Sequence, residues 1–248
     1  MDKAKETFHK AKTGLERDMN PKPTKTHIPS SDSDSGVSLY RPTAKLAGKK
    51  AVIIGGYSGI GRAVAILFAM EGAQVAISYL PEEEEDAPHT RAQVEKNGGE
   101  IHLIASDLTQ PANCTSLVNR AVTALSGIDI LVKWSATFRT NVDPLFHLTK
   151  SALAHLSNGA VIINSASVDA YIGTPSHVDY AASKGAVIAF TRALSTAGLV
   201  WSPLIATGMS ERGQKGQGLG NWTPIERLGQ PSEIATSEGV FMSGQTCM

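Results

Sequence analysis

Short apolar runs alternate with helix-like runs along the chain from Leu46 onward. The apolar runs are rich in β-branched residues and have the length of buried strands. This alternation favours right-handed crossovers and an α/β fold with one parallel, doubly wound sheet and helices on both faces. The expected strands are Ala51–Ile54, Gln74–Tyr79, Ile101–Ala105, Ile128–Val132 and Ala160–Asn164, and the expected helices are Gly59–Glu71, Glu84–Asn97, Pro111–Leu125, Asn141–Leu156 and Asp179–Thr196.

The first 40 residues follow a different pattern. They are polar, contain Pro21, Pro23 and Pro29, and include the run SSDSDSG. A segment of this composition buries too little apolar surface to offset the entropy of ordering it. We therefore expect a flexible polar arm over residues 1–40, followed by one α/β domain over residues 41–248. An organelle-targeting role is the alternative interpretation of the arm.

The first expected strand ends in a glycine-rich turn, within the sequence AVIIGGYSGIGRA. Glycines let the chain turn tightly and let a pyrophosphate approach the backbone. The helix that follows supplies unpaired N–H donors and a partial positive charge at its N-terminus. Strand, glycine turn and helix in this order predict a nucleotide-binding site, with a plain structural turn as the alternative. The expected cofactor contacts in the turn are Gly55, Ser58, Gly59, Ile60, Gly61 and Arg62.

Composition narrows the classes of function. The chain carries 23 basic and 23 acidic residues, so its net charge of zero gives no support for binding nucleic acid or an anionic membrane. Two cysteines, Cys114 and Cys247, are too few for a disulfide framework or a zinc site. No apolar run approaches the length of a membrane span, and the N-terminus lacks the apolar core of a secretory signal. We expect a cytoplasmic protein without a metal site.

The stretch VIINSASVDAYIGTPSHVDYAASKGAVIAFTRAL carries a recognisable set of polar residues. Tyr180 and Lys184 form a Tyr-x-x-x-Lys motif, and Ser167 lies thirteen positions before the tyrosine. Together with the glycine turn, this set resembles the short-chain dehydrogenase/reductase family, in particular its glucose/ribitol dehydrogenase-like branch. The resemblance runs from about Leu46 to the C-terminus. It implies a Rossmann fold and a fourth catalytic position at Asn141.

These residue types suit hydride-transfer chemistry. Tyr180 and Lys184 are spaced i and i+4, so they share one helix face. A nearby ammonium favours phenolate over phenol and would lower a tyrosine pKa from about 10. Tyr180 would then exchange a proton with the substrate oxygen, and Ser167 would stabilise the charge that develops there. The resemblance further implies that Lys184 holds the nicotinamide ribose and that Asn141 positions a water in a proton relay.

Further positions bear on the choice of cofactor. Asp107, followed by Leu108, matches the aspartate with which the family binds adenine; a helix N-cap is the alternative. The second strand ends in Tyr79, where NAD enzymes usually place a carboxylate for the ribose 2′-OH. Arg62 could meet a 2′-phosphate, whereas the acidic run Glu82–Asp86 would oppose that phosphate if it lay close. We expect NADP as the cofactor, with NAD as the alternative.

The second half of the chain departs from the family pattern. After the fourth expected strand the family carries Asn-Asn-Ala-Gly and a long loop, whereas this chain runs from Val132 directly into KWSATFRTN. Lys133-Trp134-Ser135-Ala136 could substitute for that motif, but we expect that both the motif and its long loop are missing. After Thr196 the chain passes to AGLVWSPLIATG, which resembles the family's Pro-Gly-x-x-x-Thr cofactor segment with Ser202 in place of threonine. The sixth strand that normally lies between has no counterpart, and the C-terminus is too short for the usual last helix and strand. We therefore expect a sheet without its sixth strand and without a complete seventh.

Three hypotheses for function follow. The first is an oxidoreductase that transfers hydride between NADP(H) and a small carbonyl or secondary alcohol, such as a sugar, polyol or aldehyde. The second is a catalytically impaired pseudoenzyme that binds nucleotide, and the third is a mis-spliced chain without a stable fold. The resemblance also implies a homo-oligomer, a dimer or tetramer, with no nucleic-acid or membrane partner. Its interface would use the helices expected at Asn141–Leu156 and Asp179–Thr196.

Overall fold

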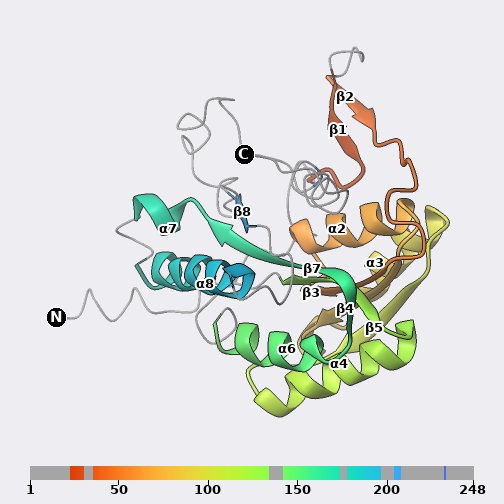
Figure 1. Cartoon of the computed structure of the whole chain (residues 1–248). Helices are drawn as coiled ribbons and strands as arrows, with labels where there is room; N and C mark the ends of the chain where they lie inside the picture. Colours follow the sequence, from red (N-terminus) through yellow and green to blue (C-terminus); the bar gives the residue numbers. More distant parts are fainter. Residues whose placement is uncertain are drawn as a thin grey trace.

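The computed structural model describes residues 23–30, 36–133, 142–173, 178–196, 204–207 and 232. Within them the chain forms a six-stranded parallel sheet, which confirms the predicted doubly wound α/β fold (Figure 1). Of the six strands of this sheet, the first and the fourth in chain order lie side by side at its centre. The strands, in spatial order, are β5 (Ile101–Ala105), β4 (Gln74–Tyr79), β3 (Lys50–Ile54), β6 (Ile128–Lys133), β7 (Leu156–Ser167) and β8 (Leu204–Thr207).

Helices cover both faces of this sheet. They are α2 (Gly59–Met70), α3 (Ala87–Lys96), α4 (Pro111–Leu125), α6 (Asp143–Leu153) and α8 (Val178–Thr196). Side chains of a strand alternate between its two faces, so Ile53 packs with α2 and α3 while Val52 packs with α4, α6 and α8. Figure 1 shows α2 above the sheet and α4 and α6 below it. No helix within the described ranges is both long enough and apolar enough to cross a membrane.

The expected elements form with small shifts in their bounds. β4, β5 and α4 have the predicted ends. α3 begins at Ala87 because Pro81–Glu83 forms a separate 3₁₀ turn, η3. β7 extends beyond the expected strand at both ends and carries Ser167 as its last residue. The carboxyl end of β7 therefore presents Ser167 on the side of the sheet where the parallel strands end and where such folds bind ligands.

The expectation that the sheet lacks its sixth strand is wrong. β8 pairs in parallel with the end of β7, in a register that joins Asn164 to Leu204 and Ser167 to Thr207. An open edge at β7 would leave a row of backbone N–H and C=O groups without partners. The chain after Pro203 pairs with that edge, so the sheet has six strands. A seventh strand would fall outside the described residues.

Part of the N-terminal arm is also ordered, which differs from the expectation of a flexible segment. Its residues form an antiparallel hairpin of β1 (His27–Pro29) and β2 (Val37–Leu39). Ser232 Oγ donates a hydrogen bond to the His27 carbonyl oxygen at 2.6 Å. The buried carboxylate of Glu71, at the end of α2, accepts hydrogen bonds from Tyr40 Oη and from the Lys45 backbone N–H. Long-range contacts of this kind leave no periodic signal in the sequence.

Candidate active site

The glycine turn joins β3 to α2 and depends on residues without a Cβ. Gly55 and Gly59 have φ values of +78° and +52°, in the left-handed region that glycine adopts without strain. A Cβ on Gly61 would lie 2.1 Å from the Gly55 carbonyl oxygen, and one on Gly56 would lie 2.4 Å from Ile77 Cγ2. The turn therefore packs closely against itself and against β4.

The N-terminus of α2 faces this turn with its first backbone amides. Ser58 is the N-cap and makes no side-chain capping hydrogen bond, and the first turn contains no acidic residue. Ile60 packs partly against the core below. Backbone amides and the partial positive charge of a helix N-terminus are suited to a pyrophosphate. The residues predicted to hold the cofactor phosphates thus fit a dinucleotide.

Arg62 is buried beneath the turn. Its Nε donates a hydrogen bond to Thr90 Oγ1 at 2.9 Å, and its Nη2 donates to the Tyr57 carbonyl oxygen. The same Nη2 lies 3.7 Å from Asp86 Oδ1. These contacts connect α2 with α3 and hold Tyr57 within the turn. The guanidinium expected to meet a 2′-phosphate is therefore engaged inside the protein.

The acidic run lies close to the glycine turn. Tyr57 Oη donates a hydrogen bond to Glu83 Oε1 at 2.5 Å. Burial raises the pKa of Glu83, and this effect exceeds the opposing hydrogen bonds from Tyr57 and the Leu80 backbone. Tyr79, at the end of β4, is buried, and its pKa is raised by burial and by a hydrogen bond to Glu84. Carboxylates of η3 and the residue after it therefore border the expected ribose end of the site.

Asp107 lies in the loop between β5 and α4. Its Oδ1 accepts a hydrogen bond from the Thr109 backbone N–H at 3.0 Å, which lowers the carboxyl pKa. The N-cap of α4 is Gln110, so Asp107 is not the cap of that helix. Asn113 Nδ2 donates to the Asp107 carbonyl oxygen at 2.8 Å, and Leu108 packs partly against the core. The loop is thereby fixed to the first turn of α4.

The start of α8 places Lys184 against the carboxyl-terminal part of β7, the strand that ends in Ser167. Lys184 is buried, and its Nζ donates a hydrogen bond to the Ser165 carbonyl oxygen at 3.0 Å. The same Nζ lies 5.6 Å from the centroid of the Tyr180 ring. Ser167 is buried two residues beyond Ser165, and its Oγ accepts a hydrogen bond from the Asp169 backbone N–H at 3.2 Å. Asn141 and Ser202, the other predicted site residues, lie outside the described residues.

Burial sets the charge state of the lysine in this group. It lowers the pKa of Lys184 from 10.5 to about 8. Most Lys184 side chains are therefore protonated near neutral pH, but the neutral fraction is much larger than for a lysine in water. An ammonium beside a phenol favours the phenolate form, which is the form that accepts a proton from an alcohol.

The model of the short chain dehydrogenase family matches residues 49–199, a stretch that contains the glycine turn and the Ser167, Tyr180 and Lys184 group. The chain belongs to this family. It is 38% identical over 261 residues to NADPH-dependent aldehyde reductase 1, chloroplastic, of Arabidopsis thaliana, covering 91% of this chain and 90% of the relative. It is 36% identical over 251 residues to glucose and ribitol dehydrogenase of Daucus carota, covering 87% and 86%.

A solved structure agrees with these relatives. A short chain dehydrogenase from Burkholderia cenocepacia, in complex with NADP, superposes with a TM-score of 0.72 at 26% identity, covering 80% of this chain and 91% of that one. The 261-residue alignment with the aldehyde reductase is longer than the 248 residues of this chain. That relative therefore carries residues without a counterpart here, in agreement with the departures from the family pattern found in the sequence.

Lys133 follows the apolar run Ile130–Val132, and its place in the core is not evident from the sequence. It ends β6 and is buried. Its Nζ donates a hydrogen bond to Thr149 Oγ1 at 2.7 Å and lies 5.4 Å from the centroid of the Phe190 ring. Burial lowers its pKa to about 7. The only sequence signal is a lysine that continues an apolar strand; its side chain connects β6 with α6 and α8.

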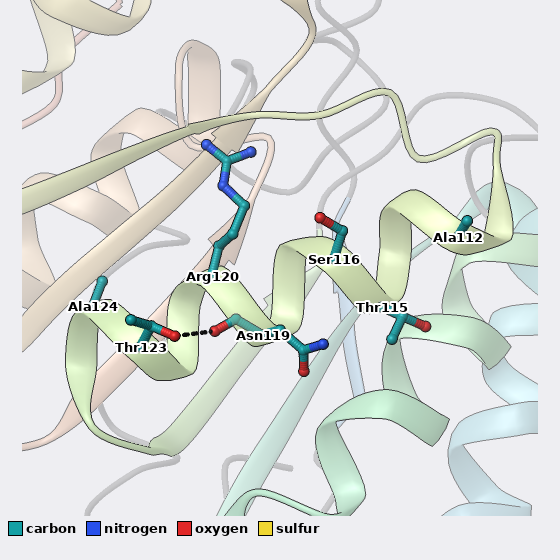
Figure 2. A pocket seen from close by; sticks show the side chains of 7 residues that line it. All are labelled: Ala112, Thr115, Ser116, Asn119, Arg120, Thr123 and Ala124. Atoms are coloured by element: carbon teal, nitrogen blue, oxygen red, sulfur yellow. Dashed lines mark hydrogen bonds between the residues drawn. The ribbon is translucent and has the colours of Figure 1, made fainter.

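A hollow of about 690 Å³ lies along α4, apart from the residues described above (Figure 2). Its lining comes from this one helix, and Arg120 extends from it to donate an Nη1 hydrogen bond to the Ala105 carbonyl oxygen at 3.1 Å. None of the lining residues is a candidate catalytic or cofactor residue. The lining residues are Ala112, Thr115, Ser116, Asn119, Arg120, Thr123 and Ala124.

Proposed function

We propose that this chain is an oxidoreductase that transfers hydride between NADP(H) and a small carbonyl compound or secondary alcohol. The observation that carries the proposal is the buried Lys184 amine, held between the Ser165 carbonyl oxygen and the Tyr180 ring at the strand end that bears Ser167. The names of the aldehyde reductase and of the glucose and ribitol dehydrogenase support this class of reaction.

Each catalytic residue has a distinct task in the proposed reduction. The bound cofactor supplies the hydride. Ser167 donates a hydrogen bond to the carbonyl oxygen of the substrate and stabilises the charge that develops there. Tyr180 gives its phenolic proton to that oxygen as the alcohol forms, and Lys184 stabilises the phenolate that remains. Asn141 completes the set as the residue that positions a water for proton return.

The cofactor contacts extend from the glycine turn to α8. NADP is favoured over NAD by the aldehyde reductase, whose name specifies NADPH, and by the structure solved with NADP. Arg62 and Tyr79 act at the ribose end, where Arg62 supports the turn through Tyr57. Asp107 and Leu108 border the adenine. Gly55, Ser58, Gly59, Ile60 and Gly61 would hold the phosphates, and Tyr180, Lys184 and Ser202 would hold the nicotinamide side.

The decisive experiment is an assay of NADPH oxidation by the purified full chain with a panel of aldehydes, ketones and sugars. We expect steady oxidation with at least one carbonyl compound and a slower rate with NADH. Thermal stabilisation by NADPH without turnover would overturn catalysis in favour of the nucleotide-binding pseudoenzyme. Absence of a cooperative melting transition would contradict both hypotheses.

Replacement of Gly61 by alanine is expected to weaken NADPH binding by at least about tenfold. The new Cβ would lie 2.1 Å from the Gly55 carbonyl oxygen, so the turn must open and lose its fit to the phosphates. Titration of NADPH fluorescence measures the dissociation constant. Gly98→Ala is the control: the φ of +81° makes alanine strained there, but no atom lies within 4 Å of an added Cβ, so this variant tests backbone strain without a clash at the turn. Equal affinities in the two variants would argue against phosphate binding at this turn.

We also propose that the protein is a cytoplasmic homo-oligomer that associates through the outer faces of α6 and α8. The ring of Phe146 on α6 packs edge-on against Phe190 of α8, with centroids 4.8 Å apart, and still leaves 54% of the residue exposed. Analytical ultracentrifugation tests the assembly: wild type should sediment as a dimer or tetramer, and Phe146→Glu should shift it toward the monomer. A monomeric wild type would refute the proposal.

A further inference from the structure

Exposed apolar side chains gather beside the catalytic residues. Val168, Tyr171, Ile172 and Val178 are 42%, 60%, 68% and 69% exposed. They are half of the large exposed apolar residues found in the described part of the chain, although they fall within eleven positions of the sequence. Contiguous apolar surface on a soluble protein often marks a ligand-binding groove.

The local structure places this surface next to the reacting group. Val168 follows Ser167, and the helical turn α7 (Asp169–Ile172) begins directly after it. The Tyr171 and Ile172 backbone N–H groups donate to the Val168 carbonyl oxygen, at 2.9 and 3.1 Å. α7 packs against β7 and α8, and Figure 1 shows it beside the end of α8 that begins the helix. Tyr180 lies in that same first turn of α8.

Apart from the buried Lys184 amine at the catalytic group, the charged side chains beside these four residues are acidic. Among the described residues from 168 to 180, the charged side chains are Asp169 and Asp179, and no basic side chain accompanies them. A substrate carboxylate would meet like charges there, and the hydroxyls of a sugar would lose water against Val168, Ile172 and Val178, whose side chains offer no hydrogen bonds. An apolar substituent would gain by leaving water.

We propose that Val168, Tyr171, Ile172 and Val178 form an apolar wall of the substrate site that selects uncharged aldehydes or ketones with an apolar or aromatic substituent. This inference rests on the proposed carbonyl reduction and narrows its substrate class. Sugars, polyols and carboxylate-bearing carbonyl compounds are then poor substrates. The catalytic oxygen contacts remain those of Ser167 and Tyr180, and the wall acts on the rest of the molecule.

The kinetic test compares three aldehydes: benzaldehyde, glyceraldehyde and carboxybenzaldehyde. We expect kcat/KM for benzaldehyde to exceed those for the other two by about 10–200-fold, the range that apolar pocket contacts discriminate. The double variant Tyr171→Ser, Ile172→Ser should lose most of this preference, mainly through KM. Leu39→Ser is the control, because Leu39 is also a large exposed apolar residue, at 54%, but lies on the β1–β2 hairpin. Equal or reversed preference in the wild type would overturn the proposal.

A binding measurement separates this inference from the proposed function. Benzamide and glycolamide carry a carbonyl group that the enzyme cannot reduce, and calorimetry on the chain saturated with NADPH gives their dissociation constants. Tighter binding of benzamide, weakened in the double variant, supports the wall even if no aldehyde is reduced. Equal binding of the two amides refutes the wall even if reduction is rapid. Failure of the proposed function appears instead as absence of NADPH oxidation with every carbonyl compound.

Discussion

Tyr180→Phe is expected to lower kcat for NADPH-dependent carbonyl reduction by about 10²–10⁴-fold, the usual range for loss of a general acid or base. The substitution removes only the phenolic oxygen that transfers the proton. It keeps the ring that lies 5.6 Å from Lys184 Nζ, so the packing at the start of α8 should persist. NADPH affinity should change little, because the phosphates are held by the glycine turn. Steady-state kinetics and NADPH titration measure the two effects separately.

Tyr40→Phe provides the matched control for this substitution. Tyr40 also loses a hydroxyl, but its oxygen bonds to Glu71 at the far end of α2. Burial together with that hydrogen bond and the charge of Glu71 raises the pKa of Tyr40, so its proton takes no part in chemistry near neutral pH. We expect this variant to melt at a lower temperature and to keep its kcat. A Tyr180→Phe protein with wild-type kcat would remove Tyr180 from the proton transfer.

Local patterns were sufficient for most of the fold and for the arrangement of the site. The apolar runs around Ile53, Ile77 and Val132 each specify a strand that is buried on both faces, and these strands need no distant information to be recognised. The spacing of Tyr180 and Lys184 likewise places both on one turn of a helix. Ser167 required the position of a strand end, which the sequence predicted only approximately because β7 extends past Asn164.

Contacts between distant segments could not be predicted in this way. β8 pairs with the open edge of β7. It has only four residues, and so short a strand has too weak a hydrophobic pattern to be recognised in the sequence. Arg62 looked available for a phosphate because its position in the sequence is beside the turn. Its acceptors come from Tyr57 and from Thr90, a residue on α3. Whether a side chain near a motif faces the ligand or the core depends on such tertiary partners.

Lys133→Met is expected to raise the free energy of unfolding near pH 7 by about 1–4 kcal/mol, the gain typical of replacing a buried charge with an apolar side chain. Lys133 is buried with Thr149 and Phe190 around its ammonium, and no carboxylate pairs with it among the described ion pairs. Methionine keeps most of the length of the side chain and removes the charge. Loss of the hydrogen bond to Thr149 reduces the gain without reversing it.

The pH dependence of stability gives this prediction its sharpest test. Burial lowers the pKa of Lys133 from 10.5 to about 7 and that of Lys184 to about 8. The unfolded chain therefore binds more protons than the folded chain above these values, and the free energy of unfolding should rise with pH, by up to about 1.4 kcal/mol per pH unit for each lysine. Below about pH 7 both states are protonated, and the contribution from Lys133 levels off.

Urea denaturation of wild type and Lys133→Met at pH 7, 8 and 9 measures these slopes. For the variant, the rise in the free energy of unfolding that Lys133 causes between pH 7 and 8 should be absent. Above pH 8 its free energy of unfolding should still rise by the amount that Lys184 contributes. Lys150→Met is the control, because Lys150 lies next to Thr149 on α6 with its side chain in water. That control should follow the wild-type curve at all three values. A Lys133→Met protein with the wild-type slope, or with lower stability at pH 7, would show that the Lys133 ammonium is well solvated in the folded protein.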